Sequence, residues 1–415
     1  MPKKNLWITL CIANLVIVAL LGVILRAKQL FPIPFIDYKN LLSGHSHFAF
    51  GGWVTLALMI LLIDKLLTPQ QQRRKYYQYI LMAVQVSSCG MLLAFPLQGY
   101  AMFSMIFSTG FILVTYLFAW FFIRDLRERK IGKPVFLLAL VAMISLAVSS
   151  VGPFSLAYMM ASKTGNALLF RDSIYTYLHF QYNGFFTLSV FALFLGAKEA
   201  VVLKRARRLA NRFAILLSIS VFPSLFISLL WHESVYFKIL ATVGVIFIGL
   251  TLITFLHMMI SNKRLSPYDK PARILIILSL IAFVLKMALQ ATTIVPSLGQ
   301  AVFGFRPIII GFLHLVFLAF VSFYIIAEFV EDGSIRFEFT ISRFAILAFA
   351  AAVIFNEAVL LVNGIGLLLQ KTDPVFGWLL FYAAMGLFCG AGLLLAAKFR
   401  SSIALTKTKG MRLAV

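Results

Sequence analysis

Long apolar runs separated by short polar breaks dominate the chain. A helix needs about 20 mostly apolar residues to cross a bilayer, and twelve runs of about that length are present. They cover residues 6–27, 42–63, 78–97, 101–123, 134–158, 175–197, 213–232, 236–260, 272–294, 303–328, 341–369 and 375–397. The breaks between them are too short for a second domain. The pattern predicts an all-α, polytopic membrane protein in which residues 1–415 form a single transmembrane domain.

Basic residues alternate between the two ends of these predicted helices. If the N-terminus lies inside the cell, the inner segments hold 28 of the 37 Lys and Arg residues and the outer segments hold eight, while Lys286 lies within a span. Cytoplasmic loops of membrane proteins carry an excess of this kind. The asymmetry predicts a multi-pass protein of the cell (inner) membrane with both termini in the cytoplasm.

Composition supports the same interpretation. The chain is 62% hydrophobic and 12% charged, whereas about 25% of the residues in a soluble domain are charged. A net charge of +23 would also suit a nucleic-acid-binding protein, but the basic residues form short clusters between apolar runs rather than a polar face. We therefore expect the lipid bilayer as the partner and no nucleic acid.

Histidine is the residue type here that is best suited to bind a metal or haem, because imidazole is the commonest metal ligand and a frequent haem-iron ligand. Four spans that run inward carry histidines, and so does one that runs outward. The positions are His45 and His47 on the second span, His179 on the sixth, His314 on the tenth, His232 at the end of the seventh and His257 near the inner end of the eighth.

Helix geometry separates these residues further. His45 and His47 are two positions apart, so they lie about 200° apart around a helix and suit two cofactors on opposite sides better than one chelated ion. His179 and Asn183 are four positions apart and share a face. The alternative for each histidine is a structural hydrogen bond, or a polar helix start near the membrane interface.

Two segments resemble known motifs. His45-Ser46-His47-Phe48-Ala49-Phe50 is similar to the H-x-H-L-A-F pattern of subunit I of the haem–copper oxidases, and the segment from His179 to Gly184 resembles the H-x-x-x-E-G pattern of their nitric oxide reductase branch. Proteins of this family have twelve helices, both ends in the cytoplasm, and metal ligands on helices two, six, seven and ten.

The resemblance implies a haem–copper oxidase subunit I-like bundle that binds haem b. It implies haem ligands among His45, His47 and His314, and copper or non-haem iron bound among His45, His47, His179, His232 and His314. The implied activity is electron transfer, or reduction or sensing of a small gas such as O2 or NO. Because the chain has no CxxCH haem-attachment motif, electrons would come from a cytochrome c subunit or from quinol.

The sequence also departs from the family pattern. The family has its H-x-H motif on helix ten, whereas here it lies on the second span. The acidic residue that follows the helix-six histidine is replaced by Asn183, and the paired histidines of helix seven are missing, with only His232 nearby. No catalytic residue is therefore assigned.

A second set of polar residues supports an alternative function. Ionisable side chains inside a membrane are costly and are functional candidates for that reason. Lys286 on the ninth span and Glu357 on the eleventh lie at compatible depths, and a pair between them would reduce the cost of burying both. With Gln290 they would form a polar path, which suits a twelve-span secondary transporter without haem.

Overall fold

The computed structural model describes residues 1, 3–197, 206–261, 268, 270–371 and 373–413. In this part of the chain, twelve helical segments are long and apolar enough to cross a membrane, and no strand occurs. Each predicted apolar run overlaps one of these segments. The prediction of a polytopic helical membrane protein is therefore confirmed.

Five of the twelve spans consist of more than one helical element. In chain order the spans are α1 (Lys4–Leu30); α2 (Tyr38–Phe48), η1 (Ala49–Thr55) and α3 (Leu56–Leu66); α5 (Lys75–Gln98); α6 (Met102–Arg129); α7 (Lys133–Ser149) and α8 (Val151–Ser162); α9 (Ala167–His179), η2 (Phe180–Phe186) and α10 (Thr187–Gly196); α12 (Arg207–Ser224) and η3 (Leu225–His232); α13 (Val235–Ser261); α14 (Lys270–Thr292); α16 (Arg306–His314), η4 (Leu315–Ser322) and α17 (Phe323–Glu331); α18 (Thr340–Leu368); and α19 (Val375–Leu413). Two short helices, α4 (Pro69–Gln72) and α15 (Pro296–Gly304), lie between spans.

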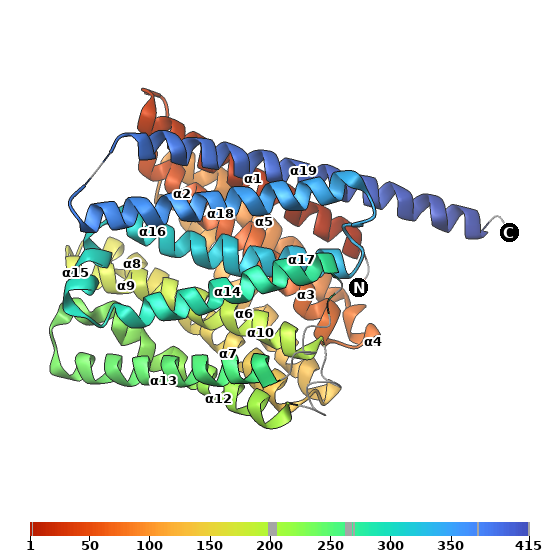
Figure 1. The fold of residues 1–415 in the computed structure, drawn as a ribbon, viewed down its shortest axis with the longest axis horizontal. Helices are drawn as coiled ribbons and strands as arrows, with labels where there is room; N and C mark the ends of the chain where they lie inside the picture. Colours follow the sequence, from red (N-terminus) through yellow and green to blue (C-terminus); the bar gives the residue numbers. More distant parts are fainter. Residues whose placement is uncertain (2, 198–205, 262–267, 269, 372, 414–415) are drawn as a thin grey trace.

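The long helices lie side by side along one direction (Figure 1). The two termini lie at the same end of this bundle, called here the terminus end, and α15 lies at the opposite end. The last helix, α19, packs along α1 and α18 and then continues past the other helices. The even number of candidate spans in the described part of the chain agrees with termini at one end of the bundle.

The second and sixth spans form the centre of the bundle. In their most apolar stretches, 83% and 94% of the residues are buried, against 22% in the fourth span, α6. A helix that is apolar all round is stable in either environment, protein or lipid. The difference in burial therefore separates the central helices from those that face lipid.

Three spans change from α-helix to π-helix near their histidines. The π segment η2 begins directly after His179, η4 begins directly after His314, and η1 begins two residues after His47. A π-helix is rare and usually occurs as a single wide turn, frequently at a functional site. Sequence periodicity did not predict these segments.

The three π segments meet one another at the centre. The rings of Phe50, Phe186 and Phe317 have centroid separations of 4.4, 5.4 and 5.7 Å. Next to them, Trp53 Nε1 on η1 donates a hydrogen bond of 2.8 Å to Ser322 Oγ at the end of η4. These contacts hold the three histidine-bearing spans against each other.

One of the shortest predicted breaks, between the third and fourth spans, depends on one glycine. Gly99 follows the last residue of α5 with φ of +64°, a conformation that glycine adopts at no steric cost. A Cβ atom at this position would also lie 2.6 Å from Oδ1 of Asn40. The chain can therefore reverse direction between α5 and α6 within a very short connection.

The variant Gly99→Ala is expected to lose about 1–3 kcal/mol of stability, because it combines left-handed backbone strain with the contact to Asn40. Unfolding of the detergent-solubilised chain would measure this loss. The matched control is Gly165→Ala, since a Cβ at Gly165 would meet no atom within 4 Å. Equal stabilities of the two variants would contradict the explanation.

Candidate functional site

His45 is held by the neighbouring helix α1. Its Nδ1 donates a hydrogen bond of 3.1 Å to the carbonyl oxygen of Val18, and its ring lies beside Gly22. A carbonyl only accepts, so Nδ1 carries the proton and Nε2 keeps its lone pair. This arrangement, in which one ring nitrogen is fixed by a backbone carbonyl, is common for histidines whose other nitrogen binds a metal.

His314 ends α16, directly before the π segment η4. Its Nδ1 is buried and has no hydrogen-bond partner in the part of the chain that the structure describes. The ring lies within electrostatic range of His45 and of Arg26. A buried polar atom usually has a partner, so His314 is a candidate for a contact with a bound group.

His47 points to the other side of α2. Its ring stacks on Phe95 at a centroid distance of 4.3 Å and an interplanar angle of 11°, and its Nε2 hydrogen-bonds to the Tyr100 hydroxyl at 3.2 Å. Burial raises the pKa of Tyr100, so this hydroxyl keeps its proton. The prediction that His45 and His47 face opposite ways is confirmed.

His179 has hydrogen bonds at both ring nitrogens. Nε2 donates to the carbonyl oxygen of Val221 on α12 at 2.7 Å, and Nδ1 accepts from Asn183 Nδ2 at 3.0 Å. Where α12 tightens into the 3-10 segment η3, the backbone N–H of Leu225 donates to the carbonyls of Phe222 and Pro223 instead of to that of Val221. The Val221 carbonyl thus loses its usual helical donor, and His179 replaces it.

His232 belongs to a separate group. Its Nε2 donates to Asp172 Oδ2 at 2.8 Å, and Trp231 Nε1 donates to Asp172 Oδ1 at 2.9 Å. Arg171 lies 4.0 Å from the centroid of the Trp231 ring. His257 is exposed on α13. Within the described ranges, no three His, Cys, Asp or Glu side chains converge on a point that suits a metal ion.

The predicted contact between Lys286 and Glu357 is wrong. Lys286 Nζ donates instead to Thr187 Oγ1 at 2.9 Å, while Glu357 accepts a hydrogen bond from its neighbour Asn356 at 3.0 Å. Gln290 is buried one helical turn beyond Lys286. Similar depth along two helices does not fix the direction in which each side chain points, which is why the pairing fails.

Sequence analysis missed several groups that the fold brings together. Arg306 at the start of α16 lies within electrostatic range of Arg26, which in turn acts on His45. Near the terminus end, the buried Glu328 accepts from Tyr268 at 2.6 Å and from Tyr324 at 2.9 Å. Burial, together with the Glu328 carboxylate, raises the pKa of Tyr268. Only the four-residue spacing of Tyr324 and Glu328 was visible in the sequence.

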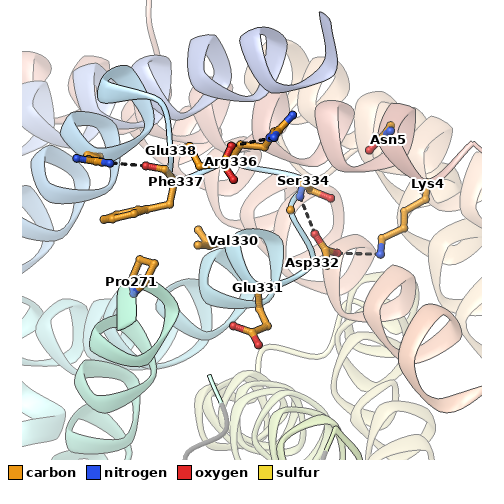
Figure 2. A pocket seen from close by; sticks show the side chains of 12 residues that line it. Lys4, Asn5, Pro271, Val330, Glu331, Asp332, Ser334, Arg336, Phe337 and Glu338 are labelled. Atoms are coloured by element: carbon orange, nitrogen blue, oxygen red, sulfur yellow. Dashed lines mark hydrogen bonds and ion pairs between the residues drawn. The ribbon is translucent and has the colours of Figure 1, made fainter. Parts of the chain in front are cut away.

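A cavity of about 500 Å³ opens at the terminus end between α1, α14, α17 and α18 (Figure 2). Two ion pairs lie on its wall, Lys4 with Asp332 and Arg336 with Glu338, each at 2.8 Å. The cavity lies at the opposite end of the bundle from His45. It is therefore separate from the histidine site.

No protein-family model matches this chain, and no curated protein matches it in sequence. The interpretation of the site depends on its own residues and contacts.

Proposed function

We propose that this chain is a haem-binding membrane protein of the haem–copper oxidase subunit I-like type, in which His45 and His314 would hold one haem b. The observation that carries the proposal is the hydrogen bonding of the two imidazole rings. His45 has its Nδ1 fixed on Val18 and keeps the Nε2 lone pair, and the buried Nδ1 of His314 has no partner among the described residues. The rings lie within electrostatic range of each other.

The surroundings of the two rings also suit a haem. Every residue of α16 is at least partly accessible, although η4 and α17, which continue the same span, contain many buried residues. The guanidinium of Arg26 lies within electrostatic range of both imidazole rings and of Arg306. Haem carries two propionates, and guanidinium groups are suited to pair with carboxylates.

The residues present do not fit the second metal that the resemblance implies. Both nitrogens of His179 are used in hydrogen bonds, and the Lys286 ammonium is close enough to repel a cation there. His232 is committed to Asp172. We therefore propose one haem and assign no ligands to copper or non-haem iron.

Bound haem supplies one-electron redox chemistry. Because His45 and His314 would both be used to hold the haem, we propose electron transfer in preference to reduction or sensing of O2 or NO. The charge asymmetry of the loops supports a location in the cell (inner) membrane with cytoplasmic termini. The electron donor is then quinol or a cytochrome c subunit.

The test is the optical spectrum of the full-length chain, purified in detergent from cells supplied with a haem precursor. We expect a Soret band, sharp bands in the reduced spectrum and close to one haem iron per chain. Purified, folded protein with neither a Soret band nor iron would overturn the proposal.

His179→Phe gives an independent test of the single-cofactor assignment. We expect unchanged haem and metal content, because His179 is a structural hydrogen-bonding residue. We also expect a loss of about 1–3 kcal/mol, because the Val221 carbonyl keeps only the long 3.4 Å bond from Ser224 Oγ and Asn183 Nδ2 loses its acceptor. Metal analysis and detergent unfolding measure the two quantities. A second metal that is present in the wild type and absent from the variant would contradict the assignment.

The alternative function is a secondary transporter without haem. Lys286, fully buried inside the membrane, favours it, because such residues often mark ion or substrate paths. Haem-free protein that drives solute uptake in proteoliposomes, with equal rates in wild type and His45→Ala, would support this function instead.

A further inference from the structure

A second polar group lies around Lys286 on α14, separate from His45 and His314. The Lys286 side chain is fully buried, and its Nζ donates to Thr187 Oγ1 at 2.9 Å. An ammonium group has three N–H donors, and no carboxylate among the described residues acts on this one. At least part of its hydrogen-bonding capacity and, when the amine is protonated, all of its charge therefore need another partner.

Aromatic rings surround the ammonium. Nζ lies 5.9 Å from the ring centroid of Tyr182 and 6.0 Å from those of Phe283 and Phe320. The ring faces attract a cation, and their bulk keeps water away. They favour a charged Lys286, but they supply no counter-charge.

Two amide side chains near Lys286 are also incompletely paired. Gln290 lies one helical turn further along α14 and so shares a face with Lys286. It is 5% exposed, and neither of its amide atoms has a hydrogen-bond partner within the described part of the chain. Asn183 uses its Nδ2 on His179, while its Oδ1 has no partner among the same residues. Buried amides without partners are rare, and the N–H groups of Gln290 are donors that suit an anion, whereas the oxygens of Gln290 and Asn183 only accept. The unpaired Gln290 donors therefore point to a missing acceptor beside Lys286.

We propose that Lys286 and Gln290 form a binding site for a small monovalent anion, such as chloride, inside the membrane. The anion is the counter-charge of the ammonium and accepts N–H groups from Lys286 and from the Gln290 amide. The same positive charge that opposes a metal ion beside His179 attracts an anion. The site does not depend on haem.

The test measures equilibrium binding of radioactive chloride to the full-length chain in detergent. We expect saturable binding of about one chloride per chain in the wild type and no saturable binding in Lys286→Met. Lys398→Met is the matched control, because Lys398 is also fully buried and donates to Asn5 Oδ1 at 3.1 Å. This control is expected to bind chloride as the wild type does.

Gln290→Leu keeps the proposal testable if Lys286→Met does not fold. It removes one donor and is expected to weaken chloride binding about tenfold. Absence of saturable binding in folded wild type, or binding unchanged in the Lys286 and Gln290 variants, would overturn the proposal. The measurement is made on haem-loaded and haem-free preparations, so a failed optical test of the haem leaves its outcome unaffected.

Discussion

Replacing His45 with Ala is expected to remove the haem from the purified chain. In the proposed site His45 would offer Nε2 to the iron while Val18 holds its Nδ1, so the substitution removes one of the two proposed haem ligands and leaves the backbone unchanged. Haem content per chain should fall at least about tenfold. His314→Ala should have the same effect, and the Soret absorbance relative to protein absorbance measures both. Free imidazole added during expression should restore part of the haem in His45→Ala.

His47→Ala provides the closest control, because it lies two residues away on the same helix and contacts Phe95 and Tyr100 instead. This variant, and His257→Ala on α13, should keep the haem content of the wild type. Loss of haem in His47→Ala with retention in His45→Ala would exchange the roles of the two residues and contradict the assignment.

Replacing Asp125 with Ala is expected to give the largest loss of stability. Asp125 is fully buried near the end of α6, and its carboxylate pairs with Arg74 at 2.5 Å and with Arg124 at 3.1 Å. The hydroxyl of Tyr77 donates to it at 3.0 Å, and that of Tyr76 makes a further hydrogen bond. We expect a loss of about 2–4 kcal/mol, somewhat less than for a fully buried pair, because both arginines are partly exposed.

Detergent-based unfolding would measure this effect, with Glu338→Ala as the control. Glu338 forms an ion pair of similar length with Arg336, at 2.8 Å, but its side chain is 73% exposed. An exposed pair contributes about 0–1 kcal/mol. Similar losses in the two variants would show that burial does not govern the contribution of Asp125.

The sequence was sufficient for the membrane fold because the signal for a span is local. Twenty consecutive apolar residues identify a membrane helix without knowledge of its neighbours. The opposite directions of His45 and His47 were also predictable, since both lie in the regular helix α2. Local geometry alone determines such features.

Features that depend on the packing of distant segments were not predictable in this way. Asp172 and His232 are 60 positions apart, and nothing in either segment identifies the other as its partner. The Lys286–Glu357 pairing failed for the same reason, because depth in the membrane leaves the rotation of each helix undetermined. The contact of His45 with Val18 likewise requires the arrangement of α1 and α2.

Because of the wide turns at η1, η2 and η4, the direction in which each histidine points depends on the local helical twist as well as on its side-chain rotamer. Deleting a single residue from one of them would rewind that stretch with ordinary pitch and rotate the half of the span that precedes it by about 100°. The imidazole would remain chemically intact but would face different neighbours. Length changes in these turns are therefore a route by which such a protein can gain or lose a cofactor while every histidine is kept.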